Sequence, residues 1–139
     1  MRSDSRLSLV LFLLRLSVFL VMFVWALDKF VRPEHAAAVY ENFYFISGLG
    51  NVPIYVLGAL QMVLLIGFLI GFQKRLTYGI VLLLHGVSTL SSFRQYLAPF
   101  SDGPNLLFYA AWPMLAACFA VYYLRDLDTR WVIPGRNDS

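Results

Sequence analysis

Residues 7–27 read LSLVLFLLRLSVFLVMFVWAL, an apolar run broken by a single charged residue, Arg15. A helix rises about 1.5 Å per residue, so about 20 apolar residues cross the hydrocarbon core of a bilayer, which is about 30 Å thick. The run is longer than the apolar region of about 7–15 residues in a secretory signal peptide. We therefore expect it to be retained as a membrane span.

Three further stretches have a similar length and character: residues 53–72, 76–96 and 106–124. Each is bracketed by charged residues or turn formers. About three residues connect the second and third stretches, so those two helices are expected to be antiparallel neighbours. Pro113 predicts a kink in the fourth stretch. The sequence thus predicts an all-α integral membrane protein, a bundle of four transmembrane helices in a single membrane domain over residues 1–139.

The composition argues against a soluble domain. Hydrophobic residues make up 60% of the chain and charged residues 14%, against roughly a quarter charged in ordinary globular domains. The net charge of +3 comes from basic residues beside apolar runs, which is typical of membrane spans and not of a nucleic-acid surface. The single cysteine, Cys118, excludes an intramolecular disulfide and a Cys-x-x-Cys redox pair.

The longest connection is the loop over residues 28–52. Pro33 suits the first turn of a helix, and the alanines at 36–38 favour its continuation. Val39, Phe43 and Ile46 would then share one face. We expect a short amphipathic helix over residues 33–46 that lies on the membrane surface or caps the bundle on its outer side.

The distribution of Lys and Arg predicts the orientation. The N-terminus, the short middle connection and the tail carry seven of them: Arg2, Arg6, Lys74, Arg75, Arg125, Arg130 and Arg136. The opposite side carries Lys29, Arg32 and Arg94. Because cytoplasmic loops are enriched in Lys and Arg, both termini are expected in the cytoplasm, in a multi-pass protein of a bacterial inner (cytoplasmic) membrane.

Ionisable side chains inside a span are costly and are the natural candidates for a site. Arg15 lies about 12 Å into the first span by helix rise, so it can reach back to the cytoplasmic headgroups or face the interior of the bundle. His85 lies near the centre of the third span, with Ser88 and Ser92 on the same face. This face should line the bundle interior, where it either hydrogen-bonds across helices or holds a ligand.

Two more polar residues extend the candidate site. Lys29 ends the first span on the face that carries Arg15, and Gln61 lies in the second span. We predict a cavity open to the outer side, with a candidate ligand set of Arg15, Lys29, Gln61, His85, Ser88 and Ser92. A haem held by two histidines is disfavoured because His35 lies in the loop, and a zinc site lacks ligands.

Together these features resemble the DoxX and DoxX-like family of small bacterial four-helix membrane proteins. The resemblance covers residues 6–126 and rests on Arg15, Lys29, the loop over residues 33–45, the glycines and Gln61 of the second helix (Gly58, Gly67, Gly71), the basic turn Lys74-Arg75 and the polar third helix. Gln61 stands where the family usually has an acidic residue, which weakens any transfer of proton or cation chemistry to this chain.

The resemblance implies a redox-linked membrane partner. With the polar face of the third span, it leads us to expect an accessory subunit of a redox or quinone-linked membrane system that binds a quinone or a lipid, with a membrane redox protein or a second copy of the chain as the partner. Nothing in the sequence identifies catalytic residues or a metal site, and we expect the chain not to be an enzyme by itself. Two alternatives stay open: a structural or chaperone-like protein whose polar residues only lock the helices together, and a small transporter.

Overall fold

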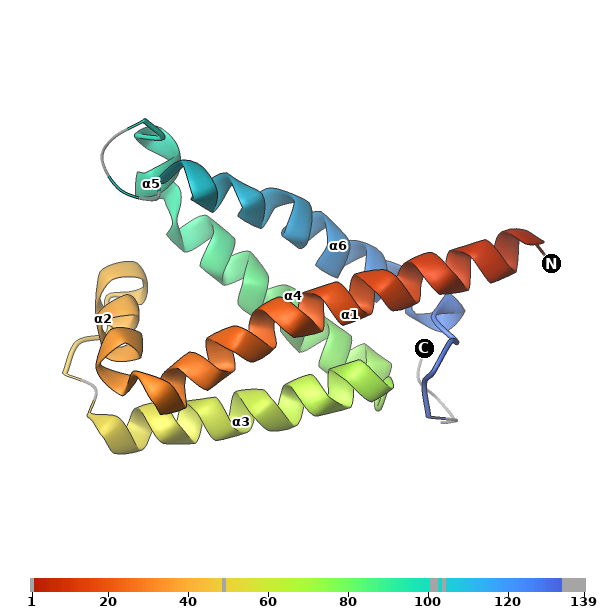
Figure 1. Cartoon of the computed structure of the whole chain (residues 1–139), viewed down its shortest axis with the longest axis horizontal. Helices are drawn as coiled ribbons and strands as arrows, with labels where there is room; N and C mark the ends of the chain where they lie inside the picture. The colour runs from red at the N-terminus through yellow and green to blue at the C-terminus, as the bar shows by residue number, and fades with distance from the viewer. Residues whose placement is uncertain (1, 49, 101–102, 104, 134–139) are drawn as a thin grey trace.

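The computed structural model describes residues 2–48, 50–100, 103 and 105–133. Four long segments form a bundle. They are α1 (Arg2–Val31), α3 (Asn51–Ile70), α4 (Lys74–Ser91) and α6 (Ala111–Tyr123). Figure 1 shows α1 beside α3 and α4 beside α6, with α4 passing across α1. The shorter elements are α2 (Pro33–Tyr44), α5 (Phe93–Leu97) and the 3-10 helices η1 (Asn105–Ala110) and η2 (Arg125–Leu127). The described residues contain no strand, so the predicted all-α class is confirmed.

Two of these helices, Ser5–Val31 and Asn51–Ile70, are long and apolar enough to cross a membrane, and Leu107–Tyr123 forms a shorter apolar helix. The third and fourth predicted spans are each divided. The third ends as α4 at Ser91 and continues as α5, and the fourth begins as η1 before it becomes α-helical at Ala111. Pro113 therefore lies in the first turn of α6, where its missing N–H is not needed.

Local sequence explains where the helices begin and end. Pro33 occupies the start of α2, and Phe45 closes that helix in the left-handed conformation with its N–H donating to the Tyr40 carbonyl. Gly71 ends α3 with φ of 74°, which favours glycine, and the Phe72 N–H donates to the Gly67 carbonyl. Residues 71–73 turn the chain, so α3 and α4 are antiparallel neighbours as expected.

The core lies where all four long segments meet. α1 pairs with α3 and α4 pairs with α6, and α1 also packs on α6. The fully buried cluster combines residues of all four helices: Val18, Met22, Ala26, Leu65, Phe68, Tyr78, Val81, Cys118 and Val121. On α1 the buried positions recur every three or four residues, and Arg15 and Lys29 fall on this inward face.

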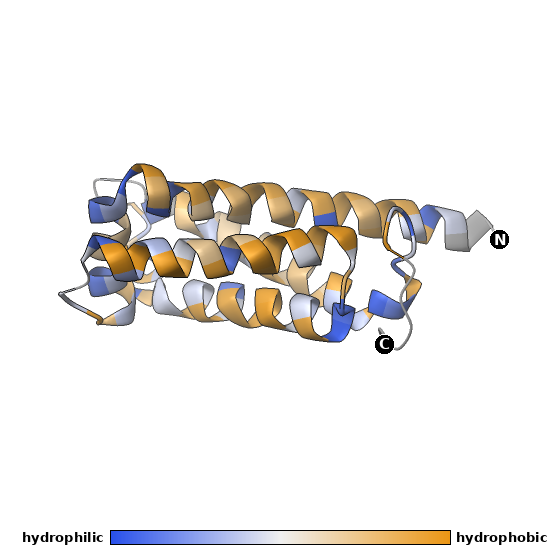
Figure 2. Cartoon of the chain, turned by 90° about the horizontal axis from the view of Figure 1, so that it is seen from below, coloured by the Kyte–Doolittle hydropathy of each residue, from blue (hydrophilic) through white to orange (hydrophobic). Residues whose placement is uncertain are grey.

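The bundle has two different ends. The tail end holds the start of α1, the turn between α3 and α4, and residues 125–133; the α2 end holds α2 and α5 (Figure 1). Figure 2 shows hydrophobic residues along the middle of the long helices and hydrophilic residues mostly near the two ends. The polar residues that are buried between the helices divide between these ends.

Candidate functional site

Arg15 is fully buried at the tail end, where it meets a carboxylate from the far end of the chain. Its Nη1 lies 2.6 Å from Oδ1 of Asp128, and both side chains are 0% exposed. The Tyr78 hydroxyl donates to Oδ2 of the same carboxylate at 2.7 Å. A buried guanidinium without a partner would be strongly destabilising, and this carboxylate supplies the partner.

The backbone of the tail completes this cluster. Arg15 Nη2 donates to the carbonyls of Arg130 (2.7 Å) and Trp131 (3.2 Å). Lys74 Nζ donates to the carbonyls of Asp128 (2.6 Å) and Arg125 (3.2 Å). These bonds fasten residues 125–131 across the end of the bundle. We call Arg15, Lys74, Tyr78 and Asp128 the tail lock.

Of the two alternatives for Arg15, the structure shows the one in which the side chain faces the interior of the bundle, and it places Arg15 away from Lys29. Lys29 lies 14 residues further along α1, about 21 Å by helix rise. The physical reason is the carboxylate: Asp128 is separated from Arg15 by 113 positions in the chain and follows the last predicted span. It neutralises Arg15 in place, so the side chain has no need to reach water.

At the α2 end, Lys29 and Gln61 form a pair between α1 and α3. Lys29 Nζ donates to Oε1 of Gln61 at 2.7 Å and lies 5.8 Å from the centre of the Tyr40 ring. Burial, with a smaller contribution from Tyr44 nearby, raises the pKa of Tyr40, which therefore stays a neutral phenol. The ammonium group thus contacts an amide oxygen and an aromatic face, with no carboxylate directly bonded to it among the described residues.

Gly58 explains how α1 and α3 approach closely enough for this pair. A Cβ at Gly58 would lie 2.9 Å from the Phe30 ring and 3.2 Å from Cβ of Lys29. Both contacts are tighter than side chains ordinarily make. The glycine that the sequence places in the second helix therefore brings Lys29 against Gln61.

His85 is buried on α4, about 10 Å along that helix from Tyr78. It is 1% exposed, and its ring lies 6.3 Å from the Trp25 ring. Nε2 lies 2.9 Å from the Ala111 carbonyl oxygen, which can only accept, so Nε2 carries the proton. Nδ1 has no hydrogen-bond partner among the described residues and is, in the neutral ring, an unfilled acceptor.

Ser88 and Ser92 continue this face toward the α2 end. The Tyr44 hydroxyl donates to Oγ of Ser88 at 3.0 Å, and Ser92 Oγ donates to the Ser88 carbonyl at 3.1 Å. Thr89 donates to the His85 carbonyl at 2.7 Å. The polar face of α4 thus points into the bundle and toward α2. Lys29 with Gln61, and His85 with Ser88 and Ser92, form two groups, and no hydrogen bond joins them among the described residues.

Two contacts were not anticipated from the sequence, those of Asp128 and Tyr44. Asp128 lies in a polar tail whose position across the bundle has no local signal. Tyr44 belongs to the predicted short helix, but only the packing of α2 against α4 shows that its hydroxyl reaches Ser88. Within the described residues, no group of three His, Cys, Asp or Glu side chains could hold a metal ion.

The chain matches no model of a known protein family, no curated protein and no solved structure.

Proposed function

We propose that this protein crosses the membrane four times, through α1, α3, α4 with α5, and η1 with α6. The support is that polarity is distributed in the opposite way from a soluble protein. Large apolar side chains face outward from the middle of the helices, such as Val63 (71% exposed) and Leu83 (64% exposed), whereas Arg15 and His85 are buried. Water would disfavour apolar surface on this scale, and lipid would favour it.

On this proposal the tail end faces the cytoplasm, in keeping with its excess of Lys and Arg, and the α2 end faces outward. The protein is a DoxX-like accessory subunit of a redox or quinone-linked membrane system in a bacterial inner membrane. Its outer half, with Lys29, Gln61, His85, Ser88 and Ser92, binds the polar head of a quinone. Arg15 belongs to the tail lock and takes no part in this site.

One observation carries the choice of ligand: the unfilled Nδ1 of His85. A buried acceptor without a donor costs about 1–3 kcal/mol, and a ligand hydroxyl would remove that cost. The reduced form of a quinone offers such a hydroxyl on a flat apolar ring. Trp25, whose ring lies beside His85, is half exposed on α1 and provides an aromatic surface for that ring.

The test is the quinone content of the protein after purification in a mild detergent, measured by solvent extraction and mass spectrometry. We expect quinone with the native protein and a loss of at least about tenfold in His85→Leu. Tyr78→Phe is the matched control, because it removes a buried hydrogen bond of the same helix at the tail end. Native protein without quinone, or His85→Leu with a native amount, would refute the proposal.

A second candidate is a structural or chaperone-like protein without a ligand. It is favoured by the bonds that already satisfy Ser88, Ser92 and Gln61 within the bundle. On that account His85→Leu lowers the melting temperature because the bond to Ala111 is lost, and any bound ligand is retained. A small transporter is disfavoured because no carboxylate lies in the middle of a proposed span. Uptake of a substrate into vesicles that contain the protein would favour the transporter over the other two candidates.

A further inference from the structure

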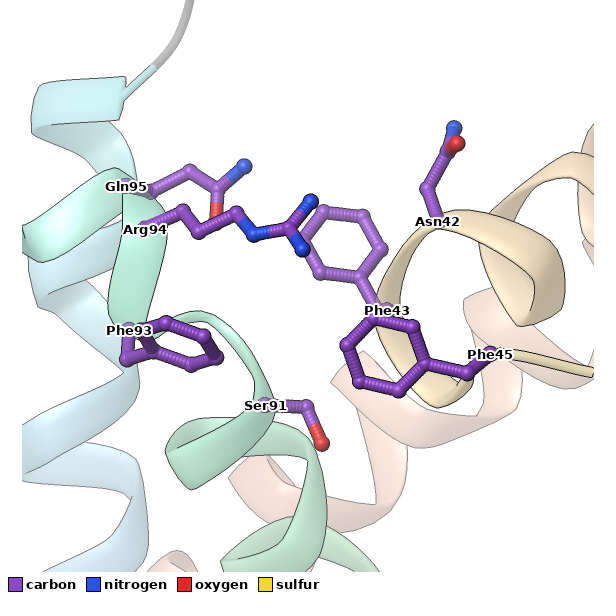
Figure 3. Close-up of a pocket in the computed structure, with 7 residues that line it drawn as sticks. All are labelled: Asn42, Phe43, Phe45, Ser91, Phe93, Arg94 and Gln95. Atoms are coloured by element: carbon purple, nitrogen blue, oxygen red, sulfur yellow. The ribbon is translucent and has the colours of Figure 1, made fainter.

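A separate pocket of about 220 Å³ opens at the α2 end, between the end of α2 and the junction of α4 with α5 (Figure 3). Its polar lining comes from Asn42, Ser91, Arg94 and Gln95, and its aromatic lining from Phe93 on one side and Phe43 and Phe45 on the other. None of the buried pairs described above lies in it. The pocket therefore needs its own explanation.

Two aromatic rings lie near the guanidinium of Arg94, whose side chain is exposed. Its guanidinium carbon lies 5.6 Å from the centre of the Phe45 ring and 5.8 Å from that of Phe93. Figure 3 shows the side chain reaching from α5 across the opening toward α2. Within the described residues no carboxylate lies within ion-pair distance of Arg94, whereas Arg32 at the same end pairs with Asp28 at 2.8 Å.

A planar guanidinium that is oriented by rings and lacks a carboxylate is suited to a phosphate group, which it can bind with two parallel hydrogen bonds. Further polar groups surround it. Oε1 of Gln95 is buried and has no partner among the described residues, and the amide of Asn42 lies across the opening. The pocket thus offers a cation for an anion and an empty acceptor for a neighbouring hydroxyl or ammonium group.

Exposed apolar side chains follow the pocket residues in the chain. Leu97 is 81% exposed and Phe100 is 87% exposed, and both follow Arg94 within six residues. Apolar side chains next to a cation at the end of a membrane bundle are typical of the boundary between headgroups and acyl chains. A ligand with a phosphate and long apolar chains matches both parts of this surface.

We infer that this pocket binds the headgroup of a phospholipid of the outer leaflet. Arg94 bonds the phosphate oxygens, Gln95 Oε1 accepts from the headgroup hydroxyl or ammonium group, and the acyl chains run along Phe93 and Leu97. The inference rests on the proposed membrane insertion and is independent of the quinone site at His85.

The experiment is native mass spectrometry of the delipidated full-length protein in a neutral detergent, titrated with phosphatidylglycerol. We expect one tightly bound lipid per chain, and affinity reduced by about tenfold or more in Arg94→Gln. Arg32→Gln is the matched control, with the same loss of charge at the same end, and should bind as the native protein does. Phe45→Leu, which removes one of the rings that orient Arg94, should also weaken binding and serves if Arg94→Gln does not fold.

Four further measurements decide the ligand and the site. Diacylglycerol with the same acyl chains should not bind tightly, and millimolar inorganic phosphate should not displace the lipid. His85→Leu should keep its phospholipid, and Arg94→Gln should keep its quinone. Equal binding by Arg94→Gln and native protein, equal binding of diacylglycerol, or displacement by inorganic phosphate would each overturn the inference without affecting the quinone proposal.

Discussion

The two ends of this bundle differ in how a buried cationic side chain is paired. At the tail end, Arg15 meets a carboxylate, and Lys74 and Arg15 together bond four backbone carbonyls of the tail. At the α2 end, among the described residues, Lys29 forms no ion pair with a carboxylate and His85 Nδ1 has no hydrogen-bond partner. The first arrangement suits a permanent structural contact, and the second leaves capacity for a ligand.

The largest effect should follow from breaking the tail lock. Asp128→Asn keeps an acceptor for Tyr78 but leaves the Arg15 charge uncompensated in the interior, which costs about 3–5 kcal/mol. We expect a large drop in the melting temperature of the detergent-solubilised protein. Asp126→Asn, an exposed carboxylate two residues earlier, is the control and should change little.

A double variant sharpens this test. Arg15→Met combined with Asp128→Asn removes both charges and should recover part of the lost stability, because the cost lies in the unpaired ion and not in the missing bond. If Asp128→Asn alone proved as stable as the native protein, the tail would not be held by this ion pair.

A smaller loss is expected where the tail crosses the turn between α3 and α4. The Ile133 N–H donates to the Ile70 carbonyl at 2.9 Å, and a Cβ at Gly71 would lie 2.6 Å from Cγ1 of Val132. Gly71→Ala should therefore destabilise the protein in two ways. An alanine in the left-handed conformation costs about 1–2 kcal/mol, and its Cβ would in addition displace the tail at Val132.

Gly48→Ala separates these two contributions. Gly48 has a similar φ of 77° and nothing within 4 Å of an added Cβ. Gly48→Ala should therefore lose only the stability that the left-handed conformation costs an alanine. Its melting temperature should fall less than that of Gly71→Ala. Equal shifts in the two variants would show that the tail does not pack on Gly71.

The smallest effect concerns the contact between α2 and α4. Tyr44→Phe removes the hydroxyl that donates to Ser88, a loss of about 0.5–1.5 kcal/mol. Hydrogen exchange of the α2 amides should become faster while exchange in α1 and α3 stays unchanged. Tyr123→Phe, at an exposed position on α6, is the control; a similar acceleration in both variants would exclude a specific role for the Tyr44 hydroxyl.

The sequence predicted well what depends on local pattern. The apolar run of residues 7–27 is part of α1, Pro33 begins α2 as expected, and Gly71 with its neighbours makes the short turn before α4. The inward polar face of α4 followed from the spacing of His85, Ser88 and Ser92. In each case the information lies within one or two helical turns.

What failed depends on contacts between distant residues. Because Arg15 and Lys29 share a face of α1, the sequence predicted that they belong to one site. In the structure they have different partners from distant parts of the chain, Asp128 for Arg15 and Gln61 for Lys29. Asp128 lies in a short polar segment without periodicity, so its return across the bundle has no sequence signal. The break between α4 and α5 at Ser92 was also missed, because the polar pattern continues through it.

If the chain crosses the membrane four times as proposed, the two ends of the bundle face different compartments. Single cysteines placed at Ser47, Arg75, Phe100 and Asp126, all exposed in the structure, can be labelled with a membrane-impermeant maleimide in intact cells, with buried Cys118 as a low background. We predict labelling at Ser47 and Phe100 in intact cells, and at Arg75 and Asp126 only after permeabilisation. Labelling of all four positions in intact cells, or release of the protein into the soluble fraction without detergent, would contradict the proposed four membrane spans.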